Sequence, residues 1–432
     1  MKIVIMAGGK GSRIRSVDSS VPKPMLPIGG KPVLEREIRR LVEQGFTDMI
    51  ITTSHLASVI EDYFGDGEKF GAKISYYREE TPLGNAGALF KIRDVLTDDF
   101  LLLNADAAFD VDFQKFVSAH NACKTMGGLA TIFTHPNSHP YDSALLVTDE
   151  RNAATEWITK ESRRPRWYQN RVNAGLHVLS VAALDLTGIS PEAVGREPRT
   201  VDLDRQVLMP LCNAGKLFCY DSPEYVKDMG TPERYEAVKR DFTSGLIAAR
   251  NLRHKQKAIF LDRDGTINRY VGFLREIDDF ELLPGVSETI RLINASGYLA
   301  IVATNQPVLA RGELSFAELR QIHNKMETLL GEEGAFLDGV YVCPHHPYKG
   351  YEGEVPELKI DCDCRKPKPG MLFQAAERWN IDLTQSWMVG DSESDIQAGK
   401  AAGCATALIG AGNCCADLSG DSLLDIVRCI LR

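Results

Sequence analysis

Two short apolar runs, each followed at once by a turn of small or acidic residues, constrain this chain more than any other feature. The first run is Lys2–Met6, followed by Ala7-Gly8-Gly9-Lys10-Gly11-Ser12-Arg13. The second is Ala258–Leu261, followed by Asp262-Arg263-Asp264-Gly265-Thr266. In open α/β sheets, ligands bind beyond the carboxyl ends of the strands, where both turns would lie. The pattern predicts two such sheets, each with a ligand site at a strand end.

Apolar strand-like runs and amphipathic helical stretches alternate along both halves, which favours an α/β fold with parallel sheets covered by helices on both faces. The predicted strands are Asp48–Thr53, Phe100–Leu103, Tyr298–Ala303 and Trp387–Val389, and the predicted helices are Val33–Gln44, Phe316–Leu330, Met371–Trp379 and Ser422–Leu431. A length of 432 residues allows two or three domains. Because Lys239–Lys257 is predicted to be a helix that ends in a basic stretch, we expect a domain at 1–245, a linker at 246–256 and a domain at 257–432.

Composition excludes several classes of function. The net charge of −9 disfavours broad nucleic-acid binding. No apolar run approaches the roughly 18 residues that cross a bilayer, and the N-terminus reaches glycine too early for a signal peptide. We therefore expect a cytoplasmic protein without membrane contact, whose ten cysteines are reduced thiols or metal ligands. The sequence leaves the oligomeric state open, a homo-oligomer included.

The first turn has the composition of a phosphate-binding loop. Gly8, Gly9 and Gly11 allow the backbone to turn sharply and to present N–H groups to an anion. Arg13 adds positive charge, and Lys23 adds another cation between two prolines.

This run, followed by Val21-Pro22-Lys23-Pro24-Met25-Leu26-Pro27-Ile28, resembles the signature of the sugar-1-phosphate nucleotidyltransferases, and the resemblance covers roughly residues 1–240. The further motifs in order are Leu83-Gly84-Asn85-Ala86-Gly87-Ala88, Leu103-Asn104-Ala105-Asp106, Glu156 with Lys160, Asn173-Ala174-Gly175 and Asp228-Met229-Gly230-Thr231-Pro232. The chain departs from the family at Ala105, usually Gly, and at Asn85, often Thr.

The resemblance implies a Rossmann-like fold and a role for each motif. Asp106 and Asp228 would hold Mg²⁺, while Arg13 and Lys23 neutralise the phosphates. The loop with Gly84 and Asn85 would contact base and sugar, and Glu156, Lys160 and Asn173 would bind the sugar phosphate. Attack of a sugar phosphate on the α-phosphorus builds charge on oxygen atoms, which cations stabilise without much proton transfer.

The second turn places two carboxylates, Asp262 and Asp264, on one short extended segment. The first can attack phosphorus, and the second can protonate the leaving oxygen and later activate water. Two anions that face a phosphate need a metal between them, and Gly390-Asp391-Ser392-Glu393-Ser394-Asp395 offers further ligands.

Thr304 and Asn305 end another predicted strand, and Arg365 with Lys366 supplies cations. This ordered set resembles the four motifs of the haloacid-dehalogenase-like phosphatases. The resemblance implies that Asp262 is the nucleophile, Asp264 the acid and base, and Asp391 a Mg²⁺ ligand together with these two residues. Thr304, Asn305, Arg365 and Lys366 would contact the substrate.

Three cysteines and a histidine form a separate pattern in the second half. Cys343, Cys362 and Cys364 with an imidazole give a Cys₃His set typical of structural Zn²⁺. The alternative is a group of free thiols. By resemblance, His345 rather than His346 would be the fourth ligand.

Together with Leu283-Pro284-Gly285-Val286, Thr304-Asn305-Gln306 and Cys364-Arg365-Lys366-Pro367-Lys368-Pro369-Gly370-Met371, this zinc knuckle resembles the heptose bisphosphate phosphatases over roughly residues 257–410. Histidinol-phosphate phosphatases share much of the pattern. Pro307-Val308-Leu309 replaces the family's usual Ser-Gly-Ile type of turn, which leaves the substrate open.

The two resemblances imply one bifunctional enzyme of NDP-heptose synthesis. The phosphatase would remove the C7 phosphate of D-glycero-D-manno-heptose 1,7-bisphosphate, and the transferase would join the heptose 1-phosphate to a nucleotide, with GTP favoured by family logic. One alternative is a mannose- or glucose-1-phosphate nucleotidyltransferase fused to a histidinol-phosphate-like phosphatase. Another is a non-catalytic sugar-nucleotide sensor that regulates the phosphatase.

Overall fold

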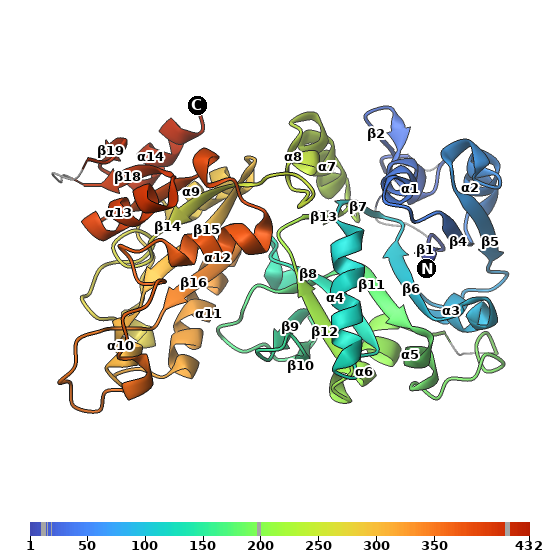
Figure 1. The fold of residues 1–432 in the computed structure, drawn as a ribbon. Coiled ribbons are helices and arrows are strands. Elements are labelled where there is room, and N and C mark those ends of the chain that lie inside the picture. The colour runs from blue at the N-terminus through green and yellow to red at the C-terminus, as the bar shows by residue number, and fades with distance from the viewer. Residues whose placement is uncertain (10–13, 15, 19, 197–199, 411–414) are drawn as a thin grey trace. The chain divides into compact units, whose positions relative to one another are not determined.

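The computed structural model describes residues 1–9, 14, 16–18, 20–196, 200–410 and 415–432. It divides the chain into two compact units (Figure 1). The N-terminal unit comprises Met1–Thr134, Leu146–Ile158 and Asn173–Asn251, and the C-terminal unit comprises His135–Leu145, Thr159–Val172 and Leu252–Arg432. Two segments from the first half of the sequence thus group with the C-terminal unit.

The sheet of the N-terminal unit is mixed. Its strand order is β10-β9-β11-β6-β1-β4-β5, with β8 beside β11 and β12 beside β8. The pairs β1–β4, β1–β6 and β4–β5 are parallel, whereas β11 runs antiparallel to β6 and β9. The expectation of a wholly parallel sheet is therefore wrong for this half. The bounds are β1 Lys2–Met6, β4 Asp48–Thr53, β5 Lys73–Arg78, β6 Asp99–Asn104, β8 Ala130–His135, β9 Leu145–Thr148, β10 Ala154–Ile158, β11 Val172–Ser180 and β12 Leu217–Asp221.

Two small pairs and eight helices complete this part of the described chain. The strands are β2 Pro27–Ile28 with β3 Lys31–Pro32, and β7 Ala107–Asp110 with β13 Tyr225–Asp228. The helices are α1 Val33–Glu43, α2 Ala57–Phe64, α3 Gly87–Lys91, α4 Phe113–Thr125, α5 Val181–Asp185, α6 Met209–Asn213, α7 Pro232–Thr243 and α8 Leu246–Ala249.

The predicted continuous helix over Lys239–Lys257 is wrong. Helix α7 ends at Thr243, and the chain turns through Gly245, whose φ of 80° is disfavoured for other residues. Helix α8 then buries Leu246 and Ile247 in an apolar cluster of the N-terminal unit, so the predicted linker begins as packed structure.

The C-terminal unit contains a six-stranded sheet in the order β16-β15-β14-β17-β18-β19, and all its pairs are parallel, as expected. The strands are β14 Lys257–Leu261, β15 Tyr298–Asn305, β16 Gly339–Cys343, β17 Trp387–Gly390, β18 Ala405–Ile409 and β19 Leu418–Gly420. The helices are α9 Val286–Asn294, α10 Pro307–Ala310, α11 Phe316–Glu332, α12 Gly370–Trp379, α13 Glu393–Ala402 and α14 Leu423–Ile430. Helix α14 confirms the predicted terminal helix.

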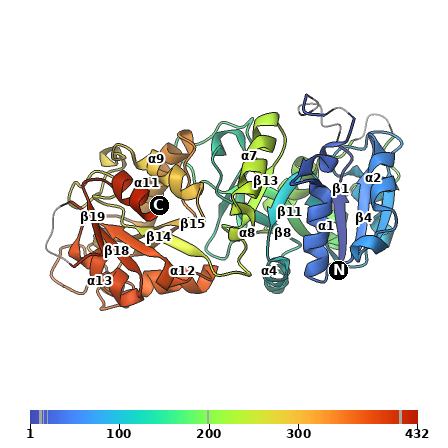
Figure 2. The same ribbon diagram turned by 90° about the horizontal axis from the view of Figure 1, so that it is seen from above.

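Helices cover both faces of this sheet. Figure 2 shows α9 and α11 on one side of β14 and β15 and α12 with α13 on the other. Successive residues of a strand face opposite sides of a sheet. Accordingly, Ile259 and Leu261 pack in one apolar cluster, while Ala258 and Phe260 pack in another.

The segment Thr159–Val172 is held by the C-terminal half of α11. The Tyr168 N–H donates to Thr328 Oγ1 at 2.9 Å, and the Asn170 N–H donates to Glu327 Oε2 at 2.7 Å. These bonds lie within the C-terminal unit. Among the described residues, no helix has the length and apolar character needed to cross a membrane.

Candidate active sites

A cavity of about 460 Å³ lies at the carboxyl ends of β1, β4, β5 and β6 in the N-terminal unit. Of the residues predicted for this site, Gly8, Gly9, Lys23, Gly84, Asn85 and Asp106 line it. Gly11 and Arg13 lie outside the described residues. Because these strands are parallel neighbours, their carboxyl ends meet at one edge of the sheet, where the ligand site was expected.

Lys23 and Asp106 form the charged end of this cavity, and Asp228, which is not among its lining residues, lies beside Asp106. Lys23 Nζ lies 2.7 Å from Asp106 Oδ2, and the lysine side chain is mostly buried. The pairing of β7 with β13 sets Asp228 opposite Ala107, beside Asp106. Burial acts to raise the pKa of Asp228, but Arg234 and Lys23 outweigh it, so the pKa is lowered and the carboxylate stays ionised. Oxygen ligands of this kind suit Mg²⁺.

The loop with Gly84 is fixed against the segment that follows residue 200. Gly84 has a φ of 84°, and a Cβ there would lie 2.3 Å from the Val201 carbonyl oxygen, so only glycine fits. Asn85 Oδ1 accepts the Leu203 N–H at 2.7 Å. The side-chain amide oxygen of Asn85 thus orders the loop, and the side-chain NH₂ group can donate to a ligand.

The predicted sugar-phosphate residues are not brought into this cavity. Glu156, Lys160 and Asn173 are absent from the described residues that line it. Lys160 belongs to the segment that groups with the C-terminal unit. Asn173 Oδ1 instead accepts the Gly175 N–H at 3.0 Å.

Glu79 lines the cavity, and the sequence reasoning missed it. It directly follows β5, a strand with too few apolar residues to stand out, although the aromatic pair Tyr76-Tyr77 is a usable signal.

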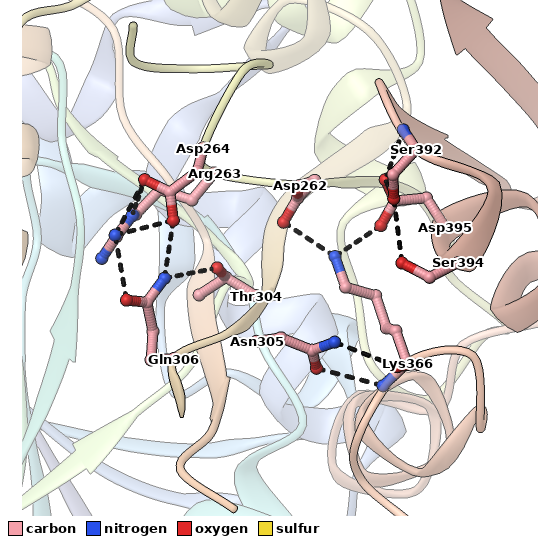
Figure 3. Close-up of polar contacts among 10 residues, drawn as sticks. All are labelled: Asp262, Arg263, Asp264, Thr304, Asn305, Gln306, Lys366, Ser392, Ser394 and Asp395. Atoms are coloured by element: carbon pink, nitrogen blue, oxygen red, sulfur yellow. Dashed lines mark hydrogen bonds and ion pairs between the residues drawn. The ribbon is translucent and has the colours of Figure 1, made fainter. Parts of the chain in front are cut away.

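The second site lies at the carboxyl ends of β14, β15 and β17 in the C-terminal unit (Figure 3). Lys366 Nζ contacts Asp262 Oδ1 at 2.7 Å and Asp395 Oδ1 at 2.6 Å. Burial lowers the pKa of Lys366, but the two carboxylates outweigh it, so the lysine stays charged. Burial, together with the Asp395 charge, raises the pKa of Asp262 to about 7 although Lys366 opposes the rise.

Asp395 belongs to the acidic motif that follows β17, and the sequence does not single it out as a ligand. Its Oδ2 accepts from Ser392 N and Oγ in a capping box that starts α13, which fixes its direction. Oxygen atoms of Asp262, Asp391 and Asp395 lie within 4.8 Å of one another. Gly265 allows this approach, because a Cβ there would lie 1.9 Å from Asp391 Oδ2. Three carboxylates at this spacing fit a Mg²⁺ ion.

The Asp264 carboxylate points away from that group. It contacts Arg263 at 2.8 Å and accepts from Gln306 Nε2 at 2.8 Å (Figure 3). Burial acts to raise the pKa of Asp264, but Arg263 and the hydrogen bonds outweigh it and lower the pKa. Asp264 is thus ionised here, and its carboxylate does not join the metal-competent set.

The other residues predicted to contact the substrate make hydrogen bonds within the site, mainly to the loop that carries Arg365 and Lys366. Asn305 exchanges two hydrogen bonds with the Lys366 backbone, both at 3.0 Å, and Arg365 donates to the His345 carbonyl oxygen at 3.2 Å. Thr304 Oγ1 accepts from Gln306 Nε2 at 2.9 Å. The loop that carries Lys366 is thereby tied both to β15 and to the cysteine cluster.

The Cys343, His345, Cys362 and Cys364 side chains converge as predicted. Their ligand atoms lie within 4.8 Å of one another, with Cys364 Sγ 3.3 Å from His345 Nδ1 and from Cys362 Sγ. Three thiols and one imidazole in this arrangement can hold a metal ion.

Two protein-family models match the chain, one in each half, and each agrees with the candidate site of that half. The model of the nucleotidyl transferase family matches residues 2–245, and a HAD-hydrolase-like family model matches residues 363–422. The α/β units and their strand-end sites thus define a nucleotidyl transferase joined to a HAD-like hydrolase.

Individual relatives narrow the second class. The D-glycero-beta-D-manno-heptose-1,7-bisphosphate 7-phosphatase of Haemophilus influenzae is 43% identical over 41% of this chain and 97% of its own length. The enzyme of the same name from Escherichia coli strain K12 is 44% identical over 35% of this chain and 78% of its own length.

Among solved structures, the chain is also similar to HddC from Yersinia pseudotuberculosis. The sequence identity is 24% and the TM-score is 0.46, over 56% of this chain and 99% of that one.

The chain therefore belongs to the nucleotidyl transferase family through its N-terminal part and to the heptose bisphosphate 7-phosphatase family through its C-terminal part. The predicted fusion of a transferase with a phosphatase is confirmed.

Proposed function

We propose that this chain catalyses two consecutive steps of NDP-heptose synthesis. The C-terminal part, 257–432, removes the C7 phosphate of D-glycero-D-manno-heptose 1,7-bisphosphate. The N-terminal part, 1–245, transfers a nucleotidyl group from a nucleoside triphosphate, GTP in first place, to the heptose 1-phosphate and releases pyrophosphate. The observation that carries the proposal is the buried Asp262–Lys366–Asp395 group in a region 43% identical to a curated 7-phosphatase, on one chain with a nucleotidyl transferase.

In the phosphatase, the Asp262 carboxylate attacks the phosphorus while Lys366 keeps it oriented and neutralises phosphate charge. Asp264, once turned away from Arg263 and protonated from solvent, gives that proton to the departing C7 oxygen. The ionised Asp264 then takes a proton from the water that hydrolyses the aspartyl phosphate. Arg263 lowers the pKa of Asp264 and so favours the ionised form that this second step requires. Mg²⁺ held by Asp262, Asp391 and Asp395 would supply charge neutralisation between nucleophile and phosphate.

In the transferase, Lys23 lies where a triphosphate would meet Asp106 and Asp228, and it offsets charge that builds on the phosphate oxygens. Mg²⁺ on the two aspartates would add a second positive centre. An oxygen of the sugar phosphate forms the new bond to the α-phosphorus, and pyrophosphate leaves. A Cβ at Gly9 would meet no heavy atom within 4 Å, so open space lies beside the backbone of this turn, where the phosphates would bind.

The direct test is incubation of the purified chain with heptose 1,7-bisphosphate, GTP and Mg²⁺. We expect phosphate, pyrophosphate and GDP-heptose. If phosphate is released but none of the nucleotides tested yields pyrophosphate, the result would support the alternative of a non-catalytic sugar-nucleotide sensor. If the chain turns over histidinol phosphate and not heptose 1,7-bisphosphate, the proposal is overturned.

We assign Zn²⁺ to the Cys₃His group and expect about one zinc per chain. Cys364→Ala should reduce phosphatase kcat/KM by roughly 10–100-fold, because Cys364 directly precedes Arg365 and Lys366 and the metal would fix that loop. Transferase activity should be unchanged.

The matched control is Cys429→Ala, which removes an exposed thiol of the same unit. Metal analysis and both activities are measured on each variant. A wild-type protein without zinc would remove the metal from this account.

A further inference from the structure

The three residues predicted to bind the sugar phosphate all lie on or beside one segment of the chain, Thr159–Val172. Lys160 belongs to it, Glu156 precedes it by three positions, and Asn173 follows it directly. The segment groups with the C-terminal unit, whereas the strands that it joins, β10 and β11, pair in the sheet of the N-terminal unit. What holds this segment therefore bears on the sugar side of the proposed transfer.

The C-terminal half of α11 holds the segment by its backbone. Glu327 Oε2 accepts the Asn170 N–H at 2.7 Å, and Thr328 Oγ1 accepts the Tyr168 N–H at 2.9 Å. All four residues are buried, and none has more than 8% of its surface exposed. A buried N–H that loses its acceptor is costly, so these two bonds fix the segment to the helix.

A second segment, His135–Leu145, packs on the same helix. A Cβ at Gly331, near the end of α11, would lie 2.6 Å from Pro140 Cγ, so only glycine allows this close approach. The Asn137 carbonyl oxygen accepts from Asn170 Nδ2 at 2.7 Å, and the Asn137 N–H donates to Asn170 Oδ1 at 3.1 Å. Asn170 is thus held both by the helix and by this second segment.

Strand β11 connects the anchored segment to the cavity of the N-terminal unit. Because β11 runs antiparallel to β6, its first residues lie at the carboxyl end of β6, where the cavity lies. There a Cβ at Gly175 would lie 2.4 Å from Nδ2 of Asn104, which lines the cavity. Asn170 is three residues before Asn173, so at most roughly 10 Å of chain separates the anchor from the start of this wall.

We propose that Glu327 and Thr328 are positioning residues for the nucleotidyl transfer, an inference that rests on the proposed function and on the predicted sugar-phosphate residues. They act through the segment rather than on a substrate, because its anchored backbone limits where Lys160 and the start of β11 can lie. A segment released from α11 gains conformational freedom that binding of the sugar phosphate must then remove, which weakens this binding. Lys23 and Asp106 hold each other at 2.7 Å without the segment, so nucleotide binding should not change.

The test compares Thr328→Val with Thr328→Ser in the full chain. Valine has nearly the volume of threonine but no oxygen, so the Tyr168 N–H loses its acceptor, whereas serine keeps the hydroxyl. For Thr328→Val we expect the KM for heptose 1-phosphate to rise about tenfold, while kcat and the KM for the triphosphate stay within about twofold of wild type. Thr328→Ser should behave as wild type. Pyrophosphate release is measured with GTP, or with UTP, ATP or CTP if the wild type prefers one of these, and each substrate is varied in turn.

Glu327→Ala should raise the same KM, and Glu327→Gln, which keeps an oxygen for the Asn170 N–H, should retain the wild-type value. Phosphate release from heptose 1,7-bisphosphate is the control for the helix itself. Nε2 of His323, on the same helix, lies 3.2 Å from a guanidinium nitrogen of Arg263, which holds Asp264. A variant that distorts α11 as a whole should therefore also lose phosphatase activity, and we expect none of the four variants to do so.

The outcomes separate this inference from the proposed function. An unchanged KM for heptose 1-phosphate in Thr328→Val or Glu327→Ala overturns the positioning role of that residue, while the proposed transfer stands. A parallel loss of phosphate release, or an equal rise in the KM for the triphosphate, indicates a general defect and overturns that role as well. A wild-type chain that forms no pyrophosphate from heptose 1-phosphate with any of the four triphosphates overturns the proposed transfer, and the inference with it.

Discussion

Asp262→Asn should reduce phosphate release from heptose 1,7-bisphosphate by at least about 10³-fold, because the amide cannot act as the attacking anion. The change is nearly isosteric, so the β14 strand end should keep its shape, and Lys366 keeps its contact with Asp395 at 2.6 Å. Pyrophosphate formation from GTP and supplied heptose 1-phosphate should continue at the wild-type rate. Both products are measured as initial rates on the same sample.

Asp279→Asn is the control, since it removes an exposed carboxylate of the same unit. Retained phosphate release in Asp262→Asn would remove Asp262 as nucleophile. Loss of both activities would show that the two sites are not independent.

Asp106→Asn should impair the transferase and spare the phosphatase, the reverse of Asp262→Asn. Its carboxylate is 41% exposed into the cavity and 2.7 Å from Lys23, so the change should leave the fold intact. With one metal ligand lost, we expect pyrophosphate formation to fall by about 10³-fold, which corresponds to several kcal/mol of transition-state stabilisation. Phosphate release should be unchanged.

Asp94→Asn, an exposed carboxylate of the same unit, serves as the control. If Asp106→Asn retained pyrophosphate formation at millimolar Mg²⁺, Asp106 would not be a metal ligand. Titration of Mg²⁺ distinguishes weakened binding of the metal from a defect in chemistry.

Much of both sites could be predicted because each motif directly follows an apolar strand. Strands β4 and β14 coincide with predicted runs almost residue for residue, and the ends of parallel strands meet at one edge. Asp262 and Lys366, 104 positions apart, therefore meet as the motif order implies.

The remaining features depend on contacts that a local pattern does not contain. The direction of β11 is set by its partners β6 and β9, so the mixed sheet could not be predicted from alternation alone. Glu79 follows the edge strand β5, in which mostly exposed and half-buried residues obscure the alternation of apolar and polar residues that indicates a strand. The pairing of Asp264 with its neighbour Arg263 is a choice of side-chain rotamer, which spacing does not encode.

The grouping of Thr159–Val172 with the C-terminal unit bears on any attempt to separate the activities. Scission of the polypeptide after Asn251 would leave Tyr168 and Asn170 on one fragment, and Thr328 and Glu327, their partners on α11, on the other. Each fragment would lose these contacts. A segment from the first half of the sequence packs within the C-terminal unit. A single inactivating substitution therefore isolates either reaction without removing contacts that truncation would remove.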